Sequence, residues 1–228
     1  MKRTVKAGAA ACAVAAAACH ASVAVADGGV YFGGNAGYTL SSYSRHAMDS
    51  GLAGQFSAAG DTLTIDSSAT SKSTTDWSAE LGYMFSPYVG IEAAYLQLGA
   101  IHYGASGTIP NGAAALQTNV TVDVHSRGPA LMLRGVLPLT QSWFVDAHLG
   151  AYDGHTRSSF TTAIDASSSS GGQSKTSTSL LAQAGTGYVF GAHWTVQADF
   201  VYINRIKDEV LGRHFNVEQL TAGLTYSF

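Results

Sequence analysis

Hydrophobic and polar residues alternate with a period of two along most of the chain after residue 27. The final nine residues, LTAGLTYSF, show the pattern clearly: apolar residues at every second position alternate with polar or small ones, namely Leu220, Ala222, Leu224, Tyr226 and Phe228 with Thr221, Gly223, Thr225 and Ser227. Such alternation predicts a β-strand with one apolar and one polar face. Eight segments carry it: 30–41, 76–85, 89–98, 126–137, 143–152, 179–190, 194–202 and 216–228.

The connections between these segments alternate in length. The short ones are 86–87, 138–142 and 191–193, and the long ones are 45–75, 99–125, 153–178 and 203–215. Strand segments of roughly 9–11 residues with short turns at one end and long loops at the other are typical of outer-membrane barrels. The predicted fold is all-β: an eight-stranded antiparallel up-and-down transmembrane β-barrel over residues 27–228, with four long surface loops and both termini periplasmic.

A soluble β-sandwich or a lipocalin-like barrel would also contain alternating strands, but with the apolar face turned inward. The polar face here is rich in glycine, as expected inside a narrow closed barrel: Gly82, Gly90, Gly128, Gly150, Gly185, Gly187 and Gly223. Aromatic residues gather near the short turns, as in an interfacial girdle: Tyr83, Phe85, Tyr88, Trp143, Phe190, Trp194, Tyr226 and Phe228. Both features favour the membrane barrel, with its apolar face toward lipid.

The first 26 residues have the features of a secretory signal peptide. A basic start, MKRTVK, precedes an Ala-rich apolar stretch that ends in the A-x-A sequence at Ala26. A lipoprotein signal at Cys19 is less well supported, because alanine stands where a bulky aliphatic residue is expected. Both cysteines, Cys12 and Cys19, lie in this leader, so the exported protein is expected to have no thiols.

The composition argues against nucleic-acid binding, a soluble domain and a cofactor. Loss of Lys2, Arg3 and Lys6 with the leader leaves nine basic residues against 15 acidic ones, which argues against nucleic-acid binding. Charged residues make up only 12% of the chain, about half the usual share in soluble domains. No metal-ligand spacing or nucleotide motif is present, so no cofactor is expected.

Six charged or titratable residues fall on the polar face of the predicted strands: Glu80, Glu92, Arg134, Asp146, His148 and Asp199. An eight-stranded barrel is just wide enough for side chains to fill it, so these groups need partners inside. Our hypothesis is a lumenal polar network in which Arg134 bridges carboxylates of neighbouring strands. We favour a structural plug over a conduction path.

Catalysis by this chain is not expected. Some small outer-membrane barrels modify lipid A with a histidine and a serine near the outer leaflet, and His214 is predicted to lie at that depth. The position where a deacylase would have serine is Asn216, so the nucleophile is missing. His125 and Ser126 are adjacent on a strand and therefore point to opposite faces.

Two predicted loop segments, 67–75 and 166–179, are polar and of low complexity. Such composition does not bury enough apolar surface to order itself alone, so we expect mobile, surface-exposed caps. If the loops have a function, it is contact with host surface ligands or with neighbouring lipopolysaccharide.

The chain resembles the OmpA-type and opacity-type barrels of the porin family. The resemblance rests on the segments VYFGGNAGY (30–38), ELGYMF (80–85), VGIEAAY (89–95) and GLTYSF (223–228). It implies a Gram-negative outer-membrane protein whose terminal aromatic residue, Phe228, helps the assembly machinery to recognise the chain. The resemblance does not extend to the peptidoglycan-binding domain of long OmpA forms, so we do not expect cell-wall tethering.

The favoured function is thus a structural or surface-interaction (adhesin-like or opacity-like) role in the outer membrane, among its lipids. A narrow porin-like channel for small solutes is the first alternative. A lipid A-modifying enzyme is the second.

Overall fold

A computed structural model describes residues 28–41, 45–72, 75–111, 114–208 and 213–228, and most of them lie in β-strands. The elements are β1 (Gly29–Ser41), α1 (Arg45–Ala58), β2 (Thr64–Lys72), β3 (Asp76–Ser86), β4 (Val89–Gln97), β5 (Ile101–Asn111), β6 (Ala114–Pro138), β7 (Trp143–Ile164), β8 (Ser167–Phe190), β9 (Trp194–Asp208) and β10 (Arg213–Ser227). The predicted signal peptide lies outside the described residues.

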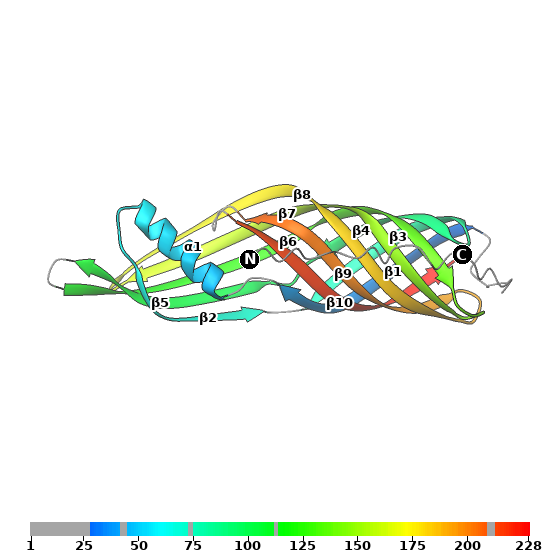
Figure 1. Cartoon of the computed structure of the whole chain (residues 1–228), viewed down its shortest axis with the longest axis horizontal. Coiled ribbons are helices and arrows are strands. Elements are labelled where there is room, and N and C mark those ends of the chain that lie inside the picture. Colours follow the sequence, from blue (N-terminus) through cyan, green and yellow to red (C-terminus); the bar gives the residue numbers. More distant parts are fainter. Residues whose placement is uncertain (1–27, 42–44, 73–74, 112–113, 209–212) are drawn as a thin grey trace, which may run out of the picture.

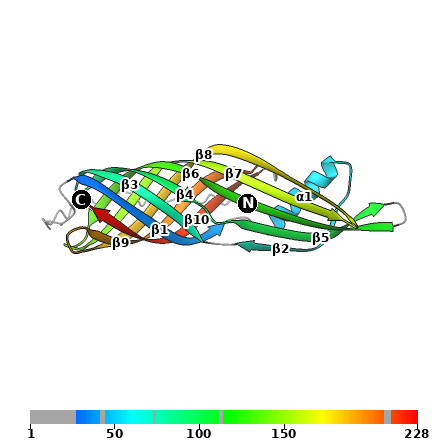
Figure 2. The ribbon, with the colours of Figure 1, turned by 180° about the vertical axis from the view of Figure 1, so that it is seen from behind.

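Eight strands close into a ring in the order β1-β3-β4-β6-β7-β8-β9-β10, and every neighbouring pair is antiparallel. The first and last strands close it, pairing from Tyr31–Ser227 to Ser41–Val217. In a closed ring every strand has a neighbour on both sides, so the backbone N–H and C=O groups are paired within the barrel, as the interior of a membrane requires. The predicted fold class is confirmed, and Figures 1 and 2 show the barrel from two sides.

The short turns and Phe228 gather at one end of the barrel, which we call the proximal end (Figure 1). Backbone hydrogen bonds tie them together there: Ser227 N donates to His193 O (2.8 Å), and Phe228 N donates to Val30 O (3.2 Å). The first barrel strand therefore begins, and the last one ends, at the proximal end, as the even number of strands requires.

At the other end, β6, β7 and β8 continue beyond the ring. There β5 replaces β4 as the neighbour of β6, β2 pairs with β5, and α1 lies against this sheet (Figures 1 and 2). We call α1, β2, β5 and residues 114–126, 154–164 and 167–179 the distal extension. Within the described ranges, no helix is long and apolar enough to cross a membrane.

The distal extension corrects the expectation of mobile polar caps. Residues 167–179 pair one by one with β7, from Ile164–Ser167 to Tyr152–Ser179, and Thr64–Lys72 pairs with β5. These segments bury little apolar surface of their own. They are ordered because their backbone hydrogen bonds are made to strands that the barrel already holds in place.

The distal extension packs around an apolar cluster that continues into the barrel. Met48 and Leu52 of α1 join a buried cluster with Tyr103 on β5 and with Val120 and Val122 on β6. The Tyr103 hydroxyl donates a 2.6 Å hydrogen bond to Asp49 Oδ1, which fixes the helix to the sheet. Burial raises the pKa of the Tyr103 phenol, and the Asp49 carboxylate raises it further, so the hydroxyl stays a donor.

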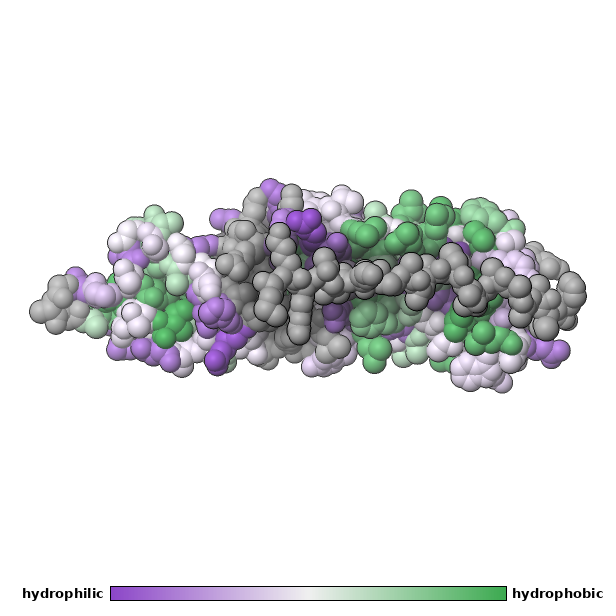
Figure 3. Space-filling model, viewed as in Figure 1, coloured by the Kyte–Doolittle hydropathy of each residue, from purple (hydrophilic) through white to green (hydrophobic). Residues whose placement is uncertain are grey.

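The two faces of the barrel strands differ as the alternation predicts. Leu133 and Leu220 point outward and are 61% and 62% exposed, whereas Glu92 on the inner face is 1% exposed. Trp77 is also exposed on the outside, so the apolar faces do not meet in a dry centre. Figure 3 shows hydrophobic residues over the barrel and hydrophilic ones where the barrel meets the distal extension.

Candidate functional site

The barrel lumen brings together six predicted polar side chains from five strands. The residues predicted to form a lumenal network are all buried inside the barrel: Glu80 (β3), Glu92 (β4), Arg134 (β6), Asp146 and His148 (β7), and Asp199 (β9). Each lies on the inner face because it alternates with an outward-facing neighbour, as Arg134 does with Leu133.

Arg134 lies between carboxylates of its two neighbouring strands. Its Nη2 is 2.7 Å from Asp146 Oδ2 on β7, and its Nη1 is 4.0 Å from Glu92 Oε2 on β4. His148 spans the same two acids, with Nε2 at 3.2 Å from Asp146 Oδ2 and Nδ1 at 3.6 Å from Glu92 Oε1. Two acids, one guanidinium and one imidazole thus form a compact four-residue cluster.

Two aromatic residues cover this cluster toward the proximal end. Tyr31 donates a 2.7 Å hydrogen bond from its hydroxyl to Glu92 Oε2. Arg134 Cζ lies 5.1 Å from the ring centroid of Tyr31 and 5.7 Å from that of Phe144, within reach of cation–π attraction.

Glycines directly opposite these rings make room for them. Tyr31 pairs with Gly82, where an added Cβ would lie 2.1 Å from the tyrosine ring, and Phe144 pairs with Gly187, where it would lie 2.2 Å away. The sequence analysis missed Tyr31 and Phe144 as lumenal residues. Their alternation with outward residues and the glycines on the adjacent strands were the available signal.

Glu80 belongs to a second cluster that consists of neutral donors. Asn35 Nδ2, Gln197 Nε2 and Thr225 Oγ1 donate to its carboxylate at 2.8, 3.0 and 3.1 Å. Gln197 also donates to Asn35 Oδ1 at 3.1 Å, so the cluster is cross-linked.

Asp199 remains apart from both clusters. It lies buried opposite Gly185, and among the described residues no ion pair joins it to Arg134 or His148.

Little open space remains between these side chains. A cavity of about 20 Å³ lies among Asn35, Glu80, Glu92 and Gln219, and one of about 60 Å³ opens at the proximal mouth beside Tyr31 and Phe144. A cavity of about 20 Å³ is close to the minimum that a single water needs.

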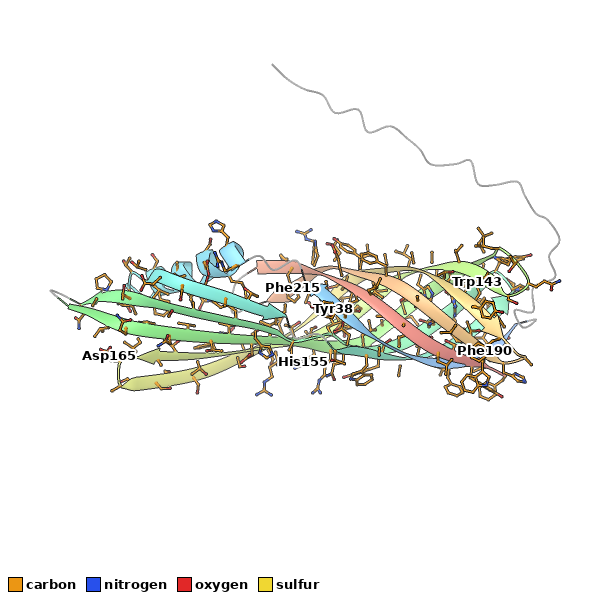
Figure 4. All side chains as sticks on the ribbon, turned by 90° about the horizontal axis from the view of Figure 1, so that it is seen from below. Tyr38, Trp143, His155, Asp165, Phe190 and Phe215 are labelled. Carbon is orange, nitrogen blue, oxygen red and sulfur yellow. The ribbon has the colours of Figure 1, made fainter. Side chains whose placement is uncertain are left out.

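The predicted interfacial aromatics lie on the outside at the proximal end. Exposed side chains there are Tyr83, Phe85, Tyr88, Trp143, Phe190, Trp194 and Phe228, and Tyr226 is half-buried among them. Rings contact one another across strands, as Trp194 and Tyr226 do at 4.9 Å between centroids. Figure 4 shows Trp143 and Phe190 at this end.

A distal set of aromatic residues was not predicted. Tyr38, Trp77 and Tyr95 are exposed on the outer surface where the barrel meets the distal extension, and the rings of Trp77 and Tyr95 lie 6.1 Å apart. The two aromatic bands bracket the exposed apolar surface.

The histidines considered for catalysis lack a nucleophile in the described structure. Ser126 is buried, bonded to Tyr152 and Thr156, and faces away from His125. Asn216 accepts a 3.0 Å hydrogen bond from the Arg205 backbone through its Oδ1. Among the described residues, no three His, Cys, Asp or Glu side chains are grouped to hold a metal ion.

Comparison with known proteins identifies the family. Residues 8–228 match the family profile described as "Outer membrane protein beta-barrel domain". No curated protein matches the chain.

Three of the solved structures that match the chain illustrate the similarity, at low sequence identity. OprG of Pseudomonas aeruginosa is 15% identical with a TM-score of 0.45, covering 90% of this chain and 99% of OprG. Neisserial surface protein A is 15% identical with a TM-score of 0.43, covering 87% and 97%. Ail of Yersinia pestis is 13% identical with a TM-score of 0.39, covering 89% and 98%.

Proposed function

Because the chain belongs to the family of outer-membrane β-barrel domains, we propose that this outer-membrane barrel has a structural and surface-interaction role. In this proposal the distal extension projects from the cell and both termini are periplasmic. The protein acts neither as a solute channel nor as an enzyme. Its partners are ligands on other surfaces, and Phe228 serves recognition by the assembly machinery.

The observation that carries the proposal is the ordered distal extension. Met48, Leu52 and Tyr103 join its helix to its sheet in a buried apolar cluster that continues into the barrel, and the barrel does not need the extension for closure. An ordered platform binds a partner at a lower entropic cost than a mobile loop, since less motion is lost on binding.

The filled lumen supports the same function over transport. Inside the lumen, Arg134 is bonded to Asp146 of the adjacent strand β7, and Tyr31 and Phe144 lie beneath it at the proximal mouth. Opening a path for ions would require breaking buried charge pairs, which is costly. We therefore expect the purified protein to give no steady conductance in planar bilayers, and steady single-channel conductance would support a pore instead.

Orientation is tested by labelling intact cells. The processed protein is expected to contain no cysteine, so Ser170→Cys, exposed in the distal extension, provides a single thiol. A membrane-impermeant maleimide should label it in whole cells. The control Gln141→Cys, in an exposed proximal turn, should be labelled only after lysis. The reverse pattern would place the distal extension in the periplasm.

Surface interaction is tested by adhesion of expressing cells to cultured epithelial cells and to extracellular-matrix proteins. We expect a variant in which a short Gly-Ser linker replaces residues 45–72 to lose the adhesion while it keeps a heat-modifiable barrel band. Gln141→Cys is the matched control and should adhere like the wild type. Adhesion no greater than that of cells without the protein would refute the surface-interaction role.

Enzymatic modification of lipid A is tested in the same cells. Mass spectra of extracted lipid A should be unchanged on expression, and a new acylation state would show that the protein is an enzyme.

A further inference from the structure

A basic cluster lies on the outer surface where the barrel meets the distal extension. Arg127 on β6 is directly opposite His155 on β7, and His125 is directly opposite Arg157. All four side chains are exposed and therefore lie on the outside of the strands. Figure 4 shows His155 pointing away from the barrel at this junction.

The arrangement of the four residues lets them act on one ligand. Directly opposite residues of an antiparallel pair are about 5 Å apart, and diagonal ones such as Arg127 and Arg157 about 7–8 Å. Both arginines therefore reach a common point above the sheet. A guanidinium is always protonated and presents a planar set of donors that matches phosphate oxygens.

The cluster lines a hollow. The cavity has a volume of about 290 Å³ and includes Gln97 at the end of β4, where β4 leaves β6 and β5 takes its place. The irregular junction between the two strands thus leaves room beside the four basic side chains, which a continuous sheet would not.

Neighbouring acids are already engaged. Asp123 contacts His102, and Asp153 accepts a 3.2 Å hydrogen bond from Thr178. Within the described parts of the chain, no ion pair is formed by Arg127 or Arg157. His155 lines the hollow and contacts Thr176 Oγ1 through Nδ1, at 3.1 Å.

The depth of the cluster indicates where its ligand lies. Ten residues of β6 separate exposed Leu137, near the proximal turns, from Arg127. At a rise of about 3.4 Å per residue and a tilt of about 45°, they span about 24 Å along the barrel axis, close to the height of a lipid-facing apolar band. Leu131 lies below the arginine on the same face, and exposed Tyr95 of β4 is paired with Pro129, which lies between them. The cluster is therefore at the level of the lipid headgroups.

We propose that Arg127, Arg157, His125 and His155 form a binding site for a phosphate group on a glycolipid of the outer leaflet, of the lipid A type. The apolar strand faces below contact the acyl chains while the two guanidinium groups hold the phosphate. This inference rests on the proposed orientation, in which the distal extension lies outside the cell. The barrel then binds one lipid molecule at a defined site, in addition to its nonspecific contacts with the surrounding bilayer.

The test uses the full processed protein in nanodiscs of neutral phosphatidylcholine. Binding of bis-phosphorylated lipid A is measured by native mass spectrometry and compared with dephosphorylated lipid A, phosphatidylglycerol and inorganic phosphate. We expect tight binding of phosphorylated lipid A and at least tenfold weaker binding by Arg127→Gln/Arg157→Gln, because each charge-assisted hydrogen bond is worth about tenfold or more.

The matched control is Arg45→Gln/Arg205→Gln, which removes the same charge from two exposed arginines elsewhere. It should bind lipid A like the wild type, since its basic cluster is intact. An equal loss in both variants would show a general charge effect and would overturn the site. Equal binding of phosphatidylglycerol would overturn the glycolipid assignment, and binding of inorganic phosphate alone would overturn the lipid site.

The labelling of Ser170→Cys separates this inference from the proposed function. Periplasmic labelling would refute the orientation and with it the outer-leaflet site. Surface labelling together with unchanged lipid A binding by Arg127→Gln/Arg157→Gln would refute the site alone.

Discussion

Replacing Arg134 with alanine should destabilise the barrel more than any exposed charge substitution. The change leaves Glu92 and Asp146 buried in the lumen without their guanidinium partner. Removing one partner of a buried ion pair costs about 3–5 kcal/mol. His148 contacts both carboxylates and compensates in part, so we expect a loss near the lower limit, about 3 kcal/mol.

The measurement is unfolding by urea of the protein refolded into lipid vesicles. The folded fraction is read from the faster band on unheated gels, and the free energy is extrapolated to water. The exposed Arg157→Ala variant is the matched control and should change stability by less than about 0.5 kcal/mol. A loss below about 1 kcal/mol for Arg134→Ala would refute the reasoning that the lumenal charges depend on this cation.

An uncharged triple variant tests whether the loss of stability comes from the unpaired charges or from lost packing. Arg134→Met combined with Glu92→Gln and Asp146→Asn removes the charges together, so neither carboxylate that Arg134 contacts is left buried without it. Replacing both sides of a buried polar interaction is often close to neutral. We therefore expect this variant to be more stable than Arg134→Ala, and equal instability would indicate a packing defect instead of a charge defect.

Three further perturbations test other parts of the barrel. Gly82→Ala should cost about 1–3 kcal/mol in the same urea assay, since its Cβ would overlap the Tyr31 ring, whereas Gly104→Ala, which meets no atom within 4 Å, should not. Leu133→Arg should cost about 2–4 kcal/mol because it places a charge in the lipid-facing band, and a smaller loss in detergent than in vesicles would confirm the cause. Deleting Phe228, whose ring centroid is 5.3 Å from that of Tyr226, should lower the amount of heat-modifiable protein in the outer membrane, and unchanged levels would refute its role in assembly.

Much of the lumen could be predicted from the sequence, because side-chain direction in a strand depends only on position within that strand. Glu92, Arg134 and His148 were placed inside by alternation alone. Which of them would touch depends on the register between strands. Alternation could not show that Asp146 would be the 2.7 Å partner of Arg134 while Asp199 stays outside the cluster.

Position along one strand also determined the outward apolar face and the aromatic residues near the proximal turns. The distal extension and the basic cluster at Arg127 were decided by the tertiary structure. The serine-rich segments gain order from backbone bonds to the strands they pair with, residues 167–179 with β7 and Thr64–Lys72 with β5, and Arg127 meets His155 through the register of β6 against β7. Local periodicity contains no information on such long-range pairing, since any strand of suitable length satisfies the same pattern.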